Sequence, residues 1–199
     1  MESKLFTPVT FGPLTLRNRT IRSAAFESMC PGNAPSDMLL DYHRSVAAGG
    51  IGMTTVAYAA VTQSGLSFDR QLWMRPEIIP GLRRLTDAIH AEGAAAGIQL
   101  GHCGNMSHKS ICGCMPVGAS SGFNLYSPTF VRGLRADELP EMARAYGRSV
   151  NLAREAGFDS VEIHAGHGYL ISQFLSPSTN HRKDEFGGLS LIHISEPTR

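Results

Sequence analysis

Two histidines and a tyrosine stand close together in the segment EIHAGHGYL, at positions 164, 167 and 169. Two imidazole donors aimed at one oxygen would stabilise negative charge that develops on that oxygen. A phenol two residues further along could deliver a proton. We therefore predict that His164 and His167 bind a substrate oxygen and that Tyr169 donates a proton. Two alternatives stay open, which are structural packing of the imidazoles and a metal site that also uses His102.

A second set of candidates combines one amide with small side chains. Gln99 lies in the segment IQLGH, Ala24 and Ala25 lie in SAAF, and Ala60 lies in AYAA. Small residues beside a hydrogen-bonding group suit a flat, planar ligand, and an amide offers both donors and an acceptor to a ring edge. A buried amide that is satisfied by the protein itself is the alternative for Gln99.

Short apolar segments alternate with helix-like segments along the chain. In three places a helix-like segment ends in a glycine, which ends a helix at low cost, and an apolar segment follows at once. The pattern predicts strands near 20–25, 52–57, 95–100 and 159–164, and helices over 37–48, 78–91 and 138–155. Strict alternation of this kind predicts an α/β fold with a parallel sheet covered by helices.

The strand ends determine where chemistry is expected, because active sites of parallel α/β folds lie at the carboxyl ends of the strands. Both a doubly wound sheet and a (β/α)₈ barrel fit the alternation. The first connection, FESMCPGNAPSD, is not a G-x-G-x-x-G phosphate loop, which weakens the dinucleotide-binding alternative.

Two local features complete the expected fold. The opening segment LFTPVTFGPLTLRNRT alternates and turns at Gly12-Pro13, which predicts a small hairpin. The helix over 37–48 should begin at Ser36 or Asp37 and bury a stripe formed by Met38, Tyr42 and Val46.

Three segments of the sequence resemble one known family. They are LFTPVTFGPLTLRNR, IQLGHCG and FDSVEIHAGHGYLISQFLSPSTNHRKDEFGG. They are similar to the old yellow enzyme, or NADH:flavin oxidoreductase, family, which includes 2,4-dienoyl-CoA reductase-like proteins. The resemblance covers residues 5–188. It implies that residues 1–188 are the N-terminal half of an FMN-binding (β/α)₈ TIM barrel that is truncated after the fourth strand and begins with a hairpin.

The resemblance also implies a function. Such an enzyme binds FMN, takes a hydride from NADH or NADPH, and reduces the activated C=C bond of an α,β-unsaturated carbonyl compound, such as an enone or an enoyl-CoA. By position, Ala24, Ala25 and Ala60 should border the flavin, and Gln99 should bind its pyrimidine edge. His164 and His167 resemble the pair that binds the substrate oxygen, and Tyr169 resembles the proton donor.

The end of the chain departs from the family. Residues 189–199, LSLIHISEPTR, are expected to be a non-native tail read from a sequencing adapter. An iron–sulfur cluster and FAD, which one branch of the family carries, would belong to a missing C-terminal part. We expect the fragment to be inactive alone. The competing interpretations are a metal-dependent TIM-barrel hydrolase and a barrel fragment without function.

Composition excludes several classes of protein. The chain has 199 residues, of which 42% are hydrophobic and 18% charged, and its formal net charge is +1. No basic patch indicates a nucleic-acid partner, and no apolar run indicates a membrane span or a secretory signal. We therefore expect a cytoplasmic protein that acts on a small molecule and that could form homo-oligomers. The four cysteines are expected to be free thiols, and no metal ligand is assigned.

Overall fold

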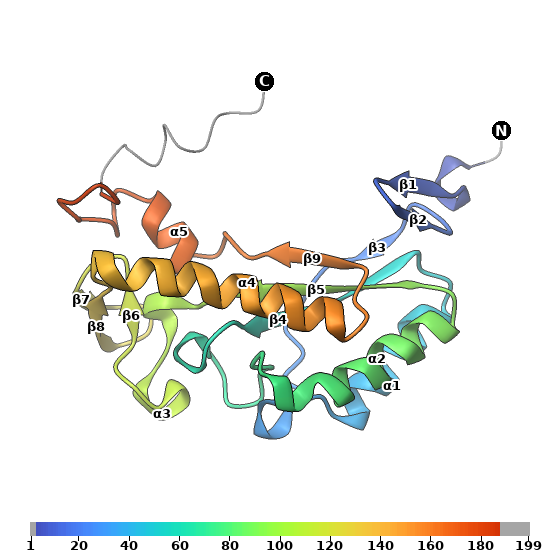
Figure 1. Ribbon diagram of the computed structural model, residues 1–199, viewed down its shortest axis with the longest axis horizontal. Coiled ribbons are helices and arrows are strands. Elements are labelled where there is room, and N and C mark those ends of the chain that lie inside the picture. Colours follow the sequence, from blue (N-terminus) through green and yellow to red (C-terminus); the bar gives the residue numbers. More distant parts are fainter. Residues whose placement is uncertain (1–2, 188–199) are drawn as a thin grey trace. The chain divides into compact units, whose positions relative to one another are not determined.

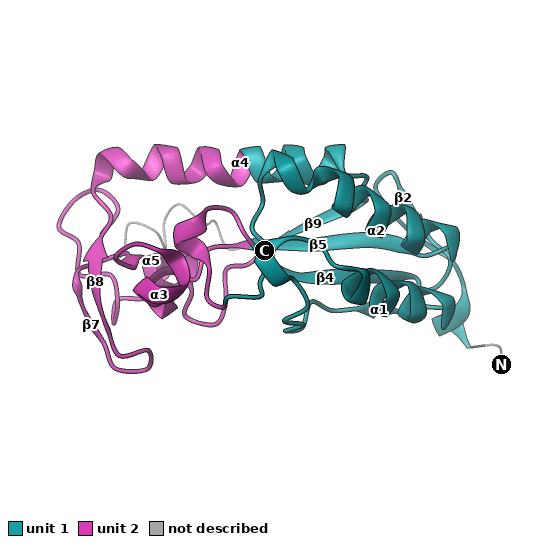
Figure 2. Ribbon diagram, turned by 90° about the horizontal axis from the view of Figure 1, so that it is seen from below, with its two compact units in different colours: residues 1–59, 69–100, 148–163 teal, residues 60–68, 101–147, 164–199 magenta. Residues whose placement is uncertain are grey.

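The structure is a computed structural model that describes residues 3–187, and the chain divides into two compact units (Figure 2). Unit 1 contains residues 3–59, 69–100 and 148–163, and unit 2 contains residues 60–68, 101–147 and 164–187. The predicted tail over 189–199 lies outside the described residues. Within the described part, no helix is long and apolar enough to cross a membrane.

A four-stranded sheet forms the centre of unit 1 (Figure 1). Its strands, in spatial order, are β3 (Ile21–Arg22), β4 (Met53–Ala60), β5 (Ala95–Gly101) and β9 (Ser160–Ile163). The pairs β3–β4 and β5–β9 are parallel. All four strands lie where the sequence predicts them, although β3 is shorter than expected and the last residues of β4 and β5 belong to unit 2.

Two helices of unit 1 pack against each other beside this sheet (Figure 1). They are α1 (Asp37–Ala48) and α2 (Ile79–Ala91). The side chain of Ser36 accepts a hydrogen bond from the backbone of Leu39 at 3.1 Å, which confirms Ser36 as the N-cap of α1. The third predicted helix is α4 (Leu139–Glu155), which contributes residues to both units.

The predicted buried stripe of α1 is wrong by one position. Met38 is 58% exposed, and Tyr42 and Val46 are only half-buried. The fully buried face consists of Leu39, His43 and Ala47. The buried imidazole has two polar neighbours, since its Nδ1 lies 2.8 Å from the hydroxyl of Thr54 and its Nε2 lies 3.0 Å from the carboxylate of Glu27. Apolar periodicity alone counts a histidine as polar and therefore places it outside the stripe.

The predicted N-terminal hairpin is present. It consists of β1 (Val9–Phe11) and β2 (Leu14–Leu16), which pair antiparallel around Gly12-Pro13. The residue that follows, Arg17, donates hydrogen bonds to the carbonyls of Ala47 at 2.5 Å, Glu92 at 2.7 Å and Ile51 at 2.9 Å. This guanidinium therefore satisfies carbonyls at the ends of both α1 and α2, which have no partner inside their own helices.

Unit 2 contains a small sheet that the sequence analysis did not predict. Its three strands are ordered β6-β8-β7, and α3 (Lys109–Cys112) and α5 (Leu170–Leu175) belong to the same unit. The strands are β6 (Val117–Gly118), β7 (Gly122–Asn124) and β8 (Thr129–Gly133). Val117, Leu134 and Leu170 form its apolar core. The long segment after β5 is thus a folded substructure rather than an open loop.

Candidate functional site

The rings of His164, His167 and Tyr169 form one cluster in unit 2. The ring centroid of His164 lies 4.9 Å from that of His167 and 4.9 Å from that of Tyr169, and both contacts are edge-to-face. His167 and Tyr169 are 6.2 Å apart by the same measure. The structure therefore brings together the three residues that the sequence predicts for substrate binding and proton transfer.

A chain of hydrogen bonds sets the tautomers of the two histidines. The backbone N–H of Gly166 donates to Nδ1 of His164 at 3.4 Å, so this nitrogen is the acceptor. Nε2 of His164 then carries the proton and donates to Nδ1 of His167 at 3.0 Å. It follows that Nε2 of His167 carries the other proton in the neutral pair.

The turn that holds these rings is strained and well supported. His167 has a φ of 56°, a left-handed conformation that side chains other than glycine rarely adopt. Gln173, which is 1% exposed, donates to the carbonyl of Gly168 at 2.6 Å and to the side chain of Asn105 at 2.9 Å. Strained residues are often found in functional turns, and here the buried amide of Gln173 stabilises the turn next to the strained His167.

Tyr169 stands at the start of α5, where its backbone carbonyl accepts a hydrogen bond from Gln173 at 2.8 Å. Burial raises the pKa of its phenol above the ordinary value, and a side-chain hydrogen bond with Ser67 lowers it in part. The phenol therefore stays protonated at neutral pH, as a proton donor requires.

His102 has a structural position rather than a place among these rings. It is fully buried, and its Nδ1 accepts a hydrogen bond from the backbone of Gly104 at 2.9 Å while its Nε2 lies 3.1 Å from Oγ of Ser64. Burial lowers the pKa of this imidazole to about 4. Among the described residues no group of three or more His, Cys, Asp or Glu side chains could hold a metal ion, so nothing favours the hydrolase alternative.

The predicted flavin-binding residues are divided between the units. In unit 1, Gln99 on β5 donates to Oε1 of Glu162 on β9 at 2.5 Å, and the two residues are partners in the strand register. Ala24 is half-buried and Ala25 is exposed, both after β3. Ala60 belongs to unit 2 and is completely buried, so its methyl group is covered by the protein.

Sequence reasoning missed a buried ionic cluster in unit 1. Oε1 of Glu27 forms ion pairs with the guanidinium of Arg22 at 2.9 Å and with Nε2 of His43 at 3.0 Å, and Oε2 of Glu27 accepts a hydrogen bond from the backbone of Ala57 at 3.2 Å. Nδ1 of His43 lies 2.8 Å from the hydroxyl of Thr54. The signal that could have found this cluster is the pair of opposite charges that flanks the small residues of RSAAFE.

The last part of the segment that resembles the family, SPSTNHRKDEFG, mainly stabilises the local structure. Asn180 donates to the carbonyls of Phe174 and Phe186 at 2.8 and 2.7 Å. Arg182 donates to the carbonyl of Leu134 and pairs with Asp184. These residues fix the loop that follows α5.

Comparison with known proteins identifies relatives along nearly the whole chain. Residues 4–191 match the model of the NADH:flavin oxidoreductase / NADH oxidase family. A protein of Rhodococcus erythropolis named 4,4'-dithiodibutanoate disulfide reductase is 43% identical over 195 residues, which are 98% of this chain and 48% of that protein. The NADPH dehydrogenase of Bacillus subtilis strain 168 is 36% identical over 193 residues, which are 94% of this chain and 56% of that protein.

A solved structure matches the fold of this chain over most of its length. The old yellow enzyme homologue from Zymomonas mobilis is 30% identical and superimposes with a TM-score of 0.86, over 94% of this chain and 55% of the other. The chain therefore has the fold of the N-terminal half of a TIM barrel, which confirms the predicted fold class. It spans about half the length of the curated relatives it matches.

Proposed function

The chain belongs to the NADH:flavin oxidoreductase / NADH oxidase family, and we propose that it forms about half of an FMN-dependent enzyme. This enzyme uses NADH or NADPH to reduce the activated C=C bond of an α,β-unsaturated carbonyl compound, an enone or an enoyl-CoA. The observation that carries the proposal is the cluster of His164, His167 and Tyr169 on a strained turn after the fourth strand of the sheet.

The residues of unit 1 fit a flavin edge. Gln99 is 9% exposed, and one amide hydrogen is engaged by Glu162. A second amide hydrogen and the carboxamide oxygen remain for a planar ligand. The small side chains of Ala24 and Ala25 leave room for a ring beside the backbone. When bound, FMN would supply hydride transfer between the nicotinamide and the substrate.

The residues of unit 2 fit the substrate carbonyl. His167 presents a protonated Nε2, and His164 orients that ring through Nδ1. A donor aimed at a carbonyl oxygen stabilises the charge that develops when the β-carbon receives a hydride, and each such donor contributes about 2.7–4 kcal/mol. Tyr169 holds the proton that the α-carbon then needs.

The relative from Rhodococcus erythropolis favours a second substrate class. Its name describes the reduction of an organic disulfide, and it is 43% identical to this chain. The same donors could stabilise charge on a leaving sulfur instead of on a carbonyl oxygen.

The test uses a full-length protein that carries this segment. Its visible spectrum should show bound flavin, and NAD(P)H oxidation should be followed with an enone and, separately, with 4,4'-dithiodibutanoate. The proposal is supported if His167→Ala loses enone reduction while the control variant His181→Ala reduces the enone at the unchanged rate. A colourless protein, or a flavoprotein that reduces neither compound, would overturn it.

A further inference from the structure

Two cysteines of unit 2, in the sequence Cys-Gly-Cys, face each other. Sγ of Cys112 and Sγ of Cys114 lie 3.8 Å apart, and the thiol of Cys112 also donates to the backbone carbonyl of Cys114 at 3.2 Å. Cys112 is 2% exposed, whereas Cys114 is exposed. One thiol is therefore accessible from solvent, and a second is held directly behind it.

Backbone geometry explains why two residues so near in sequence meet. Helix α3 ends at Cys112, and Gly113 follows with a φ of 73°, its N–H donating to the carbonyl of Lys109 at 2.9 Å. Side chains two positions apart do not face each other along a helix. The left-handed backbone of Gly113 therefore ends the helix and brings the two sulfur atoms close together. A β-carbon added at Gly113 would lie 3.2 Å from Nε2 of Gln63.

We propose that Cys112 and Cys114 are a redox-active dithiol that low-molecular-weight organic disulfides oxidise to an intraloop disulfide. The thiolate of Cys114 attacks one sulfur of R–S–S–R, which forms a mixed disulfide and releases one RS⁻. The thiolate of Cys112 then attacks the sulfur of Cys114, which closes the ring and releases a second RS⁻. The protein loses two electrons and two protons, and the organic disulfide becomes two thiols.

The pair is reversible rather than a structural crosslink. The sulfurs must approach from 3.8 Å to a bond of about 2.0 Å within a ring that contains one intervening residue. Strained or exposed disulfides are reduced readily, so an ordinary thiol should reopen this one. Burial and the hydrogen bond with Cys112 raise the pKa of Cys114 to about 11, and the guanidinium of Arg132 on β8 opposes this effect. Because the thiolate is the nucleophile, the exchange should be faster in alkaline buffer.

The experiment treats the reduced chain with bis(2-hydroxyethyl) disulfide and blocks the remaining thiols with N-ethylmaleimide. Trypsin cleaves after Lys109 and Arg132, so residues 110–132 form one peptide that contains Cys112 and Cys114 and no other cysteine. We expect this peptide to lose the mass of two hydrogen atoms and to carry no maleimide. A peptide that keeps one or two 2-hydroxyethylthio adducts, or that stays fully reduced, would overturn the proposal.

Variants assign the order of the two steps. Cys112→Ser should stop after the first step and retain one 2-hydroxyethylthio adduct on Cys114. Cys114→Ser should retain little adduct, because the remaining thiol is buried. Cys30→Ser, which removes a buried thiol of unit 1, should still give the closed ring. The opposite pattern for the first two variants would show that Cys112 is the attacking thiol and would contradict the mechanism.

A comparison of closure constants tests the role of the fold. The equilibrium between closed ring and mixed disulfide should favour closure at least about tenfold more in the native chain than in guanidinium chloride, because the fold pre-organises the sulfurs. Gly113→Ala should reduce the ratio of the closure constant in the native chain to that in guanidinium chloride. Gly122→Ala is the matched control, since a β-carbon there meets nothing within 4 Å. Equal constants in native and denatured chain would show that the geometry contributes nothing. None of these measurements requires flavin, so their outcome is independent of the proposed enzymatic function.

Discussion

Nε2 of His164 lies 3.0 Å from Nδ1 of His167, so one imidazole of the candidate site is hydrogen bonded to the other. Both rings can donate to the same oxygen only if this hydrogen bond opens. As long as it is closed, His167 is the ring that carries an outward proton, and His164 acts by fixing its tautomer.

The first prediction concerns this pair. In a full-length protein, His164→Ala should weaken the binding of phenolic ligands, which mimic a charged substrate oxygen, and should lower kcat by about 100- to 1000-fold. Flavin absorbance during ligand titration measures the first effect. His164→Asn keeps a side-chain donor and should lose less. Equal losses in the two variants would show that a donor at this position is irrelevant.

The second prediction separates the two half-reactions. Tyr169→Phe removes the phenolic proton while it preserves the ring contacts with His164. Reduction of the enone should slow, whereas reduction of the flavin by NAD(P)H should be nearly unchanged, because only the first needs a proton at the α-carbon. Stopped-flow absorbance resolves both. A parallel loss in both half-reactions would contradict the assigned role.

The third prediction concerns flavin retention. Gln99→Leu should lower the flavin content of the purified protein or shift its reduction potential, because the change removes the amide from the ring edge. It also removes the hydrogen bond to Glu162. Glu162→Leu is therefore the control, since it removes the acceptor of this hydrogen bond and leaves the amide of Gln99 in place. If both variants lose flavin to the same extent, the hydrogen bond between the strands is the cause.

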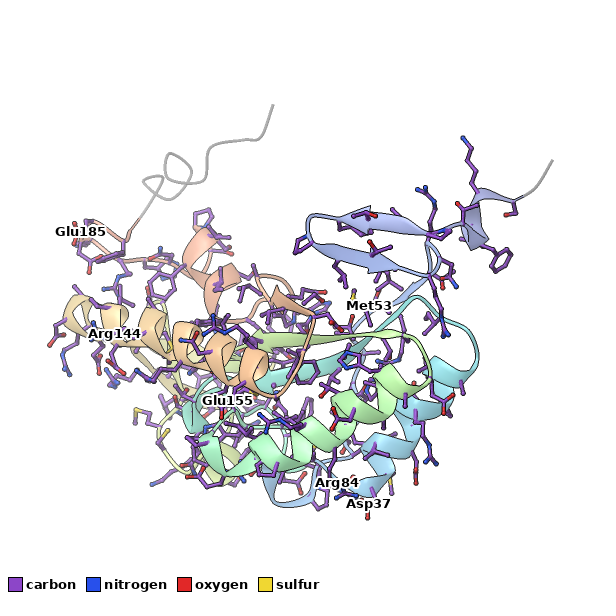
Figure 3. All side chains as sticks on the ribbon, turned by 45° about the vertical axis from the view of Figure 1, so that its right-hand side comes forward. Asp37, Met53, Arg84, Arg144, Glu155 and Glu185 are labelled. Atoms are coloured by element: carbon purple, nitrogen blue, oxygen red, sulfur yellow. The ribbon has the colours of Figure 1, made fainter. Side chains whose placement is uncertain are left out.

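The fourth prediction compares a buried ion pair with an exposed one. Glu27 is 5% exposed at the side chain and is shared by Arg22 and His43, so Glu27→Gln should lower the free energy of unfolding by about 3 kcal/mol. Asp37 and Arg84 form a 2.9 Å pair between α1 and α2 whose side chains are 81% and 69% exposed (Figure 3). Arg84→Gln should cost less than about 1 kcal/mol. Urea unfolding measures both, and equal losses would be inconsistent with the cluster as described.

The fifth prediction concerns the chain of 199 residues expressed alone. Within the described residues, β3 and β9 are the outer strands of their sheet and each has one neighbour. Ile21 and Ile163 on these strands are both 45% exposed. Unpaired strand edges and exposed apolar side chains promote association. Size-exclusion chromatography should therefore show oligomers without flavin absorbance, and a yellow, monodisperse monomer would refute this.

The sequence by itself determined the order of the elements and the identity of the candidate residues. Glycine-ended helices followed by apolar strands predicted α1, α2 and α4 and the three strands β4, β5 and β9, because helix ends and apolar periods are local properties. The remaining strand, β3, was predicted from the segment RTIRSAAF before the first helix. The spacing of His164, His167 and Tyr169 also sufficed to group them, since six consecutive positions on one turn cannot lie far apart.

Only the tertiary structure decided which partners these residues have. His43 is fully buried because Glu27 and Thr54 reach it from other segments, which no pattern within α1 could show. Gln99 meets Glu162 because β5 and β9 pair in one register, 63 positions apart in sequence. Burial and pairing depend on contacts between distant segments, and the free energy of a polar group depends on those contacts rather than on its sequence neighbours.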